Sequence, residues 1–448
     1  MDRQRAAQRG EETAANLAGR GVRAIALTWV DNAGITRVKA VPIGRLGHAA
    51  AWGVGMSPVF DVFLVDDSIT TSRFVGGPSG DLRLYPDLDR VCVLAAQPGW
   101  AWAPVDRLTQ EGEAHPACQR TFARAAVAEA AGDGLELQMA FEVEWFLGDL
   151  NATPACIGPA YGMTRVIELS SYADDLLSAL DAQGVPVDQF HPEYAPGQLE
   201  LSVAAADPVL AADRTVLVRQ TIQAVSMAHG HWASFAPVVV AGQVGNGQHL
   251  HLSAWHAQRA LFSGGDGPYG LTEAGEALLA GLLDRLPALT AISAPSVASH
   301  LRLVPQHWAA PYQCWGRENR EAALRLVTGS IGERDRAANA ELKCCDGSAN
   351  PYLVVGAVTA IARASFASGH RLPPEVPGDP ALLPATEQPP RLPLTVTEAL
   401  AALRADDVLR PALGEPLLEA FCAVRQAEAD LFTQASPEEI AEACRWRY

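Results

Sequence analysis

The sequence predicts a globular α+β protein with two domains, and three observations support this prediction. At 448 residues, the chain is longer than one hydrophobic core usually requires. Hydrophobic residues make up 49% of the chain and charged residues 19%, a composition that excludes wholesale disorder. β-prone runs precede a connector with Pro and Gly, and strand-like and helix-like segments alternate after it. We therefore expect a small domain at residues 1–107 and a larger one at residues 108–448.

The N-terminal domain is expected to begin with an Ala-rich helix and to continue in strands. The β-prone runs at residues 24–30 and 35–41 flank the turn sequence DNAG, which indicates a hairpin. Further strand-like runs occupy residues 59–65, 81–85 and 90–95.

The larger domain is expected to begin with a helix at residues 117–129 and to end in helices. A Pro-rich segment at residues 372–393 predicts a long loop, and amphipathic segments at residues 395–413 and 416–432 follow it. Residues 220–258 contain no Asp, Glu, Lys or Arg. Polar residues nevertheless interrupt each apolar run well before the roughly 20 residues that a membrane span needs. We therefore expect a buried segment here and no membrane partner.

The net charge and the cysteine content limit the kinds of binding partner and the cellular compartment that we expect for this protein. The chain has 34 Lys and Arg against 51 Asp and Glu, a net charge of −17. This sign argues against nucleic acid or an anionic membrane as the main partner. The eight cysteines form no CxxC pair, and the charged start of the chain lacks the apolar run of a signal peptide. These features predict a cytoplasmic protein.

One predicted strand places two acidic residues on the same face. Apolar residues alternate with other residues from Leu135 to Trp145, as is typical of a half-buried strand. Because side chains two residues apart share a face, Glu142 and Glu144 would repel each other unless a cation lay between them. The alternative is a solvated outer face.

Two further predicted strands carry polar residues at the same spacing. His249, His251 and Ser253 share one face of a strand that lies in an uncharged stretch. Glu341 and Lys343 share a face of the other. A single histidine would be interpreted as a core residue, but two at this spacing also fit a metal or ligand site.

A third segment brings two more acidic residues together. Glu193 and Glu200 flank a Pro-Gly turn, so a loop can direct both toward one point. Five carboxylates and an imidazole suit hard divalent cations such as Mg²⁺ or Mn²⁺, whereas zinc would usually bring Cys. Two such cations would neutralise most of the negative charge.

An Arg-rich segment lies between the histidine strand and the strand that carries Glu341. It contains Arg302, Arg317, Arg320 and Arg325. Guanidinium groups beside carboxylate-bound cations are typical of phosphoryl transfer, because both stabilise the charge of the transferring phosphate. A surface helix with Arg–Glu pairs is the alternative.

These motifs resemble those of the glutamine synthetases over nearly the whole chain. The matching segments are FEVEWF, EYAPGQLE, GNGQHLHLS, RLVP followed by ENREAALR, and DGSANPYL. The resemblance implies a β-grasp-like N-terminal domain and a catalytic α/β domain with an open antiparallel barrel. It further implies a homo-dodecamer of two hexameric rings, with active sites between neighbouring subunits.

The resemblance also implies the residues that bind metal ions and substrates. The implied ligands of one cation are Glu144, Glu193 and Glu200, and those of the other are Glu142, His249 and Glu341. The substrate glutamate is expected to bind to Gly245, Arg302 and Lys343. ATP is expected to bind to His251, Ser253 and Arg325. Arg320 is expected to act on the phosphate. The implied chemistry is phosphorylation of the γ-carboxylate of glutamate by ATP, followed by attack of an amine on the acyl phosphate.

The chain departs from the family pattern where the family binds ammonium. Trp308 stands in place of a flap glutamate, and an indole cannot accept a proton. Ser57 stands in place of an aspartate, although Asp61 is close enough to be the counterpart. We therefore expect an organic amine, in a pocket formed by Trp308, Ser57 and Phe60, with Glu193 taking the proton. The alternative is that Trp308 only packs the flap.

Three further positions differ from the family near the glutamate and phosphate sites. Asn339 and Lys343 replace two arginines of the RIEVR strand, and Val244 replaces an asparagine. Lysine keeps the charge but loses the bidentate geometry of arginine. An ordinary glutamine synthetase that uses ammonia and a non-catalytic structural or sensing homologue remain the alternatives to a glutamate–amine ligase.

Overall fold

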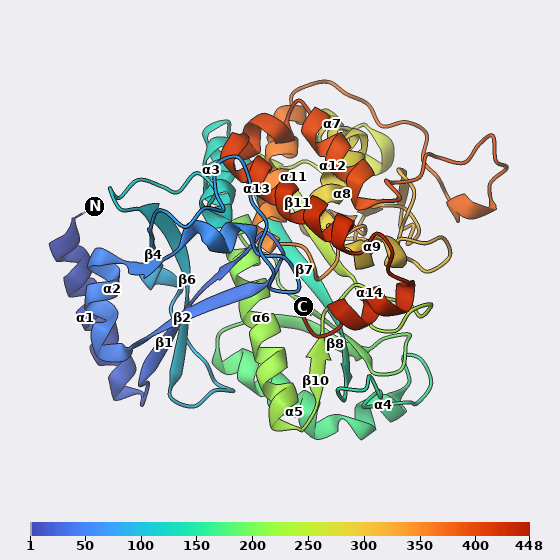
Figure 1. Ribbon diagram of the computed structural model, residues 1–448. Coiled ribbons are helices and arrows are strands. Elements are labelled where there is room, and N and C mark those ends of the chain that lie inside the picture. The colour runs from blue at the N-terminus through green and yellow to red at the C-terminus, as the bar shows by residue number, and fades with distance from the viewer. Residues whose placement is uncertain (1) are drawn as a thin grey trace.

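The computed structural model describes residues 2–448, in which the strands form two sheets (Figure 1). The N-terminal sheet has the order β2-β1-β6-β4-β3, with β5 paired to β6. Its strands are β1 (Ala24–Val30), β2 (Thr36–Pro42), β3 (Val54–Met56), β4 (Leu82–Pro86), β5 (Cys92–Val93) and β6 (Trp100–Thr109). Helices α1 (Arg3–Gly19) and α2 (Leu46–Trp52) pack together beside this sheet. The N-terminal region is therefore a compact α+β unit.

The predicted hairpin is confirmed, and its turn lies against the larger domain. β1 and β2 pair in antiparallel register from Ala24 opposite Pro42 to Val30 opposite Thr36. Gly34 in the turn has φ +80°, and a Cβ there would collide with the carbonyl oxygen of Ser348. A glycine is required here by both the backbone conformation and the close approach.

The prediction of a strand at residues 59–65 is wrong. The chain instead forms a 3₁₀ helix, Pro58–Val62, whose first turn is capped by the Ser57 side chain. Pro58 fixes φ near the helical value and the capping oxygen accepts the Val59 N–H, so local chemistry outweighs the β propensity of the valines. The strands expected at residues 81–85 and 90–95 correspond to β4 and the shorter β5.

The second sheet has the order β13-β14-β15-β11-β7-β9-β8, with β10 paired to β7 and β12 to β11. Its strands are β7 (Leu135–Gly148), β8 (Val187–Pro192), β9 (Gln198–Val203), β10 (Trp232–Ser234), β11 (Gln248–His256), β12 (Arg259–Ala260), β13 (Trp315–Arg317), β14 (Leu324–Val327) and β15 (Asn339–Leu342). The pairings are antiparallel except that of β13 with β14. Arg317 and Arg325 of the Arg-rich segment therefore lie on strands β13 and β14, and the surface helix that is the alternative does not form there.

Helices surround this sheet and bury its apolar side. They are α3 (Gln119–Gly132), α4 (Met163–Glu168), α5 (Ser170–Ala182), α6 (Pro208–Ala228), α7 (Glu273–Asp284), α8 (Leu286–Ser293), α9 (Val297–Arg302), α10 (Arg334–Ala337), α11 (Pro351–Ser365), α12 (Val396–Ala405), α13 (Leu409–Leu431) and α14 (Pro437–Cys444). α11 packs against α3, α6, α7 and α8, and Figure 1 shows α7, α11, α12 and α13 grouped on one side of the molecule. Within residues 2–448, no helix is both long and apolar enough to cross a membrane.

Asn350, at the start of α11, connects this helix to the N-terminal hairpin. Its side-chain oxygen accepts hydrogen bonds from the N–H groups of Tyr352 and Leu353, which caps the helix. Its side-chain amide donates to the carbonyl oxygens of Val30 (2.9 Å) and Asp31 (3.2 Å) in the N-terminal hairpin.

The expected helices and loop of the larger domain are largely confirmed, with different bounds. α3 corresponds to the helix expected at residues 117–129. The segment at 395–413 is divided between α12 and the start of α13, because Asp406 leaves the helical conformation (φ −71°, ψ 129°) and its side chain accepts hydrogen bonds from the N–H groups of Val408 and Leu409. Gly414, with φ +72°, then kinks α13 just before Pro416. Residues 372–393 form the expected loop around a short 3₁₀ turn, Pro380–Leu382. The domain boundary expected after residue 107 falls inside β6, two residues before that strand ends, and it remains a prediction.

Candidate active site

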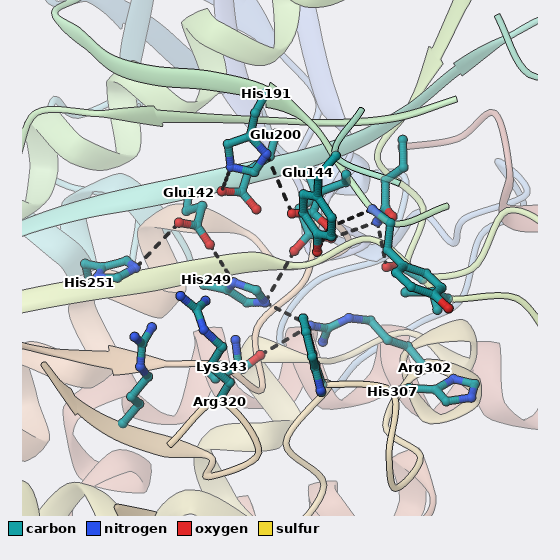
Figure 2. A pocket seen from close by; sticks show the side chains of 18 of the residues that line it. Glu142, Glu144, His191, Glu200, His249, His251, Arg302, His307, Arg320 and Lys343 are labelled. Carbon is teal, nitrogen blue, oxygen red and sulfur yellow. Dashed lines mark hydrogen bonds and ion pairs between the residues drawn. The ribbon is translucent and has the colours of Figure 1, made fainter. Parts of the chain in front are cut away.

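A cavity of about 890 Å³ opens over the face of the second sheet that carries the acidic residues (Figure 2). It collects most of the residues expected to act on metal ions and substrates. These are Glu142, Glu144, Glu193, Glu200, Gly245, His249, His251, Arg302, Trp308, Arg320, Arg325 and Lys343. Strands from distant parts of the chain therefore direct these side chains into one space, as the residues that share a face predict.

The register of β7 with its two neighbours creates the centre of the cavity. Glu142 lies opposite His249 of β11, and Glu144 lies opposite Glu200 of β9. His249 Nδ1 is 2.9 Å from Glu142 Oε1 and 3.4 Å from Glu341 Oε1. Burial alone would raise the pKa of Glu142, but the hydrogen bond and charge of His249 lower it to about 2.

Glu341 is buried beneath the cavity and is surrounded by cations. Its carboxylate lies 3.2 Å from Lys343 Nζ and 2.9 Å from Arg325 Nη1. Burial opposes ionisation, but these cations and His251 hold the pKa of Glu341 far below its usual range. Lys343, which is expected to contact the substrate glutamate, is paired with the carboxylate of Glu341 and also lines the cavity.

A second acidic cluster contains a histidine that the sequence analysis missed. His191 Nε2 lies 3.0 Å from Glu200 Oε1, and its Nδ1 lies 3.7 Å from Glu193 Oε1. The hydrogen bond to Glu200 raises the pKa of His191 to about 9, so the pair holds a proton at neutral pH. His191 is two residues before Glu193, so the spacing that identified the other strands could also have identified this one.

Glu144 is held in place by neighbouring hydrogen-bond donors. Gln198 Nε2 and the backbone N–H of Gly247 each donate to Glu144 Oε2 at 2.9 Å. Gln198 also donates to the carbonyl oxygen of Gly245, where a Cβ would collide with the carbonyl oxygen of Pro237. Gln198 thus connects a candidate metal ligand to the loop expected to bind glutamate.

The donor atoms fit divalent cations, although their grouping differs from the expected one. Among the described residues, 2–448, three sets have ligand atoms within 4.8 Å of one another: Glu142, Glu144 and His249; Glu142, His251 and Glu341; and His191, Glu193 and Glu200. Burial and the charge of Glu144 raise the pKa of Glu193, and burial raises that of Glu200 to about 8. Mutual repulsion of this kind is what a bound cation would relieve.

The guanidinium group of Arg302 is suited to an anionic ligand. Its Nη2 lies 3.2 Å from His249 Nε2 and 3.3 Å from the carbonyl oxygen of Lys343. Its Nη1 is buried, and no atom of residues 2–448 accepts a hydrogen bond from it. A buried donor without a partner is costly, so this atom is available for a carboxylate. Val244, next to Gly245, also lines the cavity.

A smaller cavity of about 380 Å³ lies beside the first, and Glu142 and His251 line both. Ser253 lines only this smaller cavity, together with Asn339. The Asn339 side-chain oxygen lies 2.9 Å from His251 Nδ1, so this residue, which replaces an arginine of the family pattern, orients the imidazole.

Exposed aromatic side chains line the mouth of the large cavity. They belong to Tyr161, Tyr194 and Trp308, and the Trp308 side chain is 54% exposed. The Tyr161 hydroxyl donates to Glu193 Oε2 at 2.9 Å. An acid and aromatic faces therefore lie together, as recognition of an organic ammonium ion requires.

Ser57 and Phe60 do not line the cavity of this chain. The ring of Phe60 instead packs edge-on against Trp29, with centroids 5.4 Å apart. Asp61 is buried, forms an ion pair with Arg107 and lies within hydrogen-bond distance, 2.8 Å, of His115 Nε2. Asp61 is therefore a structural residue here and is not exposed for an ammonium ion.

Comparisons with known proteins agree with this fold and site. Residues 116–442 match the family described as glutamine synthetase, catalytic domain, so the chain belongs to the glutamine synthetase family. It is 55% identical to the gamma-glutamylpolyamine synthetase GlnA3 of Streptomyces coelicolor, over 98% of this chain and 97% of that protein. It is 26% identical to a gamma-glutamylanilide synthase of Acinetobacter, over 98% and 94% of the two chains.

Solved structures show the same architecture. A structure described as a novel glutamine synthase homolog superposes with a TM-score of 0.86 and 32% identity, over 95% of this chain and 99% of the other. A GmaS/ADP complex superposes with a TM-score of 0.83 and 28% identity, over 95% and 97%. The expected glutamine synthetase fold is confirmed, and ATP and divalent metal ions are used generally in this family.

Proposed function

We propose that this protein is an ATP-dependent ligase that joins the γ-carboxylate of glutamate to an organic amine, through a γ-glutamyl phosphate intermediate. The observation that carries the proposal is the composition of one cavity. Six candidate metal ligands line it or lie directly beneath it, and arginines and aromatic side chains complete its wall. Carboxylates, guanidinium groups and aromatic faces are the groups needed for metal ions, phosphate and an alkylammonium ion, respectively.

The polar residues of the cavity are proposed to bind and activate glutamate and ATP. Two divalent cations, Mg²⁺ or Mn²⁺, would be held by the acidic and histidine clusters and would neutralise phosphate charge when bound. Arg302 and Gly245 would hold the glutamate, and Arg320 and Arg325 would contact the phosphate. His251 and Ser253 are proposed to lie near the nucleotide. A carboxylate is a poor electrophile, and its phosphorylation supplies a leaving group for the second step.

The acceptor is proposed to be an alkylamine, an amino alcohol or a polyamine. Such an amine has a pKa near that of Lys, roughly 10, so it arrives as a cation and must lose a proton before attack. Glu193 is the proposed proton acceptor, and Trp308 would stack against the carbon chain or the charge, contributing about 0.5–2 kcal/mol. The gamma-glutamylpolyamine synthetase to which this chain is 55% identical supports a polyamine.

The amine pocket is proposed to be completed by a second copy of the chain. Ser57 and Phe60 belong to the N-terminal domain and do not reach the cavity of their own chain. A homo-dodecamer of two hexameric rings, as the family resemblance implies, would bring them to the cavity of a neighbouring subunit. Mass photometry of the purified protein tests the assembly directly.

An assay of ATP-dependent phosphate release tests the function. The reaction contains glutamate and one of ammonium, methylamine, ethanolamine or putrescine, and kcat/KM is compared among them. We expect at least one organic amine to exceed ammonium. A higher value for ammonium would indicate an ordinary glutamine synthetase, and no release with any amine would favour a non-catalytic homologue.

A further inference from the structure

We infer that Glu321 is a positioning residue for the amine acceptor, because its carboxylate fixes the backbone of Trp308 at the mouth of the cavity. This inference rests on the proposed function, since Trp308 is there assigned to the amine. Glu321 does not line the cavity itself and would act through Trp308.

The loop that carries Trp308 has an unfavourable backbone conformation. It connects α9 to β13 and contributes Gln306, His307 and Trp308 to the cavity. Gln306, Trp308 and Ala310 have φ values of +63°, +53° and +56°. Left-handed conformations are unfavourable for residues other than glycine, so three within five residues need stabilising contacts elsewhere.

Glu321 supplies such a contact. Its Oε1 accepts a hydrogen bond from the backbone N–H of Trp308 at 2.9 Å, and only 7% of the residue is exposed. Because the acceptor is buried, water does not compete for this N–H, and the hydrogen bond is stronger than the same bond would be at the surface. The Trp308 backbone is therefore fixed while its indole remains exposed.

The position of Glu321 is itself well determined. Its backbone N–H donates to Asn319 Oδ1 at 3.0 Å, and Asn319 Nδ2 donates to the carbonyl oxygens of Val376 (2.7 Å) and Gly378 (2.8 Å). Arg320, the preceding residue, lines the cavity. Of these two consecutive residues, Arg320 thus lines the cavity, while Glu321 holds the loop that carries Trp308.

Two substitutions of Glu321 distinguish the effect of its hydrogen bond from the effect of its negative charge. Glu321→Ala removes the acceptor, whereas Glu321→Gln keeps the size of the side chain and a carbonyl oxygen that can accept the same N–H. Glu276→Ala is the matched control, because Glu276 is also buried and accepts a backbone N–H from Leu372, at 3.2 Å, outside the large cavity.

The first measurement is hydrogen–deuterium exchange of residues 303–314 in the full-length protein, which needs no substrate. We expect faster exchange in Glu321→Ala, by about tenfold, and near wild-type exchange in Glu321→Gln and Glu276→Ala. Unchanged exchange in Glu321→Ala would overturn the inference. Because this measurement is independent of the amine, it decides the anchoring role even if the proposed function fails.

The second measurement is the KM of each substrate in the phosphate-release assay. Glu321→Ala should raise the KM of the best organic amine about tenfold and change the KM of ATP and of glutamate less than twofold. Glu321→Gln should restore the wild-type KM of the amine. An equal rise for all three substrates, or an unchanged KM of the amine despite faster exchange, would contradict a role in acceptor positioning.

Discussion

Arg325 Nη1 lies 2.9 Å from Glu341 Oε2, so an arginine proposed to bind phosphate is already paired with a proposed metal ligand. β14 and β15 place these residues directly opposite each other. Each group therefore holds the other in position before any substrate arrives, and metal and phosphate sites are built from the same pair of strands.

This arrangement predicts that replacing Glu341 or Glu142 with Ala abolishes metal-dependent turnover. Removal of a carboxylate weakens the cation site, and in the case of Glu341 it also removes the partner of Arg325 Nη1, leaving Arg325 only its 3.4 Å contact with Glu318. Phosphate release is measured across a range of Mg²⁺ and Mn²⁺ concentrations, and circular dichroism checks that the fold is retained. Full turnover of either variant at saturating metal would refute the assignment.

His191→Ala is predicted to lower the apparent metal affinity by about 10–100-fold, because the pair of His191 with Glu200 orients a proposed ligand. The readout is the metal concentration that gives half-maximal phosphate release. His229→Ala is the control, since His229 forms a similar pair with Asp175, at 2.8 Å, outside the large cavity. Equal effects of the two variants would contradict a role for His191 at the metal site.

Arg320→Gln is predicted to raise the barrier of the reaction by about 2–4 kcal/mol, because one charge-assisted contact to phosphate is lost. Arg320→Lys keeps the charge but not the bidentate geometry and should have an intermediate effect. Both variants are compared with the wild type by kcat/KM for ATP. A value for Arg320→Gln within twofold of the wild type would exclude contact with the phosphate.

Trp308→Ala is predicted to reduce kcat/KM for the best organic amine by about 2- to 30-fold, which corresponds to the loss of about 0.5–2 kcal/mol of stacking. Trp308→Phe should retain part of this activity. Activity with ammonium is the internal control, because ammonium has no carbon chain to stack. If Trp308→Ala reduced the activity with the organic amine and with ammonium equally, the indole would contribute only to the packing of the loop.

Asp61→Asn is predicted to destabilise the fold by about 3–5 kcal/mol at neutral pH, since it leaves the buried Arg107 without its anionic partner. Burial alone would raise the pKa of Asp61, but Arg107 and His115 hold it below its ordinary value of 3.8. The stabilisation is therefore complete above that ordinary value and is lost as the pH falls through the lower pKa of the folded state.

Thermal unfolding of the wild type and of Asp61→Asn between pH 7 and pH 2.5 tests the predicted pH dependence of the stabilisation by Asp61. The difference in unfolding free energy should be constant above about pH 5 and should shrink below pH 4. Asp89→Asn, which removes an exposed ion pair with Arg9, should cost less than about 1 kcal/mol. If the difference in unfolding free energy between the wild type and Asp61→Asn did not change with pH, the ionisation of Asp61 would not contribute to stability.

The sequence was sufficient to predict which faces carry the site, but not how the strands meet. Alternation along β7 and β11 placed Glu142 with Glu144 and His249 with His251, and the cavity contains all four. The pairing of Glu142 with His249 depends on the register of strands about a hundred residues apart, which spacing within either strand does not determine.

Local chemistry explains the remaining differences from the prediction. The valine-rich segment at residues 59–65 resembles a strand, but Ser57 and Pro58 begin a 3₁₀ helix there. The position of Asp61 in the sequence also allows an ammonium ligand, and only the fold shows that its carboxylate is paired with Arg107. Likewise, the contact between Glu321 and Trp308 joins two residues thirteen positions apart in irregular segments, where no periodicity applies.

The hydrogen bonds of Asn350 bear on how the protein moves. One side chain both caps α11 and donates to the carbonyl oxygens of Val30 and Asp31, while Gly34 lies against Ser348 with no room for a methyl group. A hinge rotation of the N-terminal sheet would separate the buried Asn350 amide from both of these acceptors. Opening and closing during turnover is therefore expected to be confined to loops such as residues 303–314, with both domains moving as one rigid body.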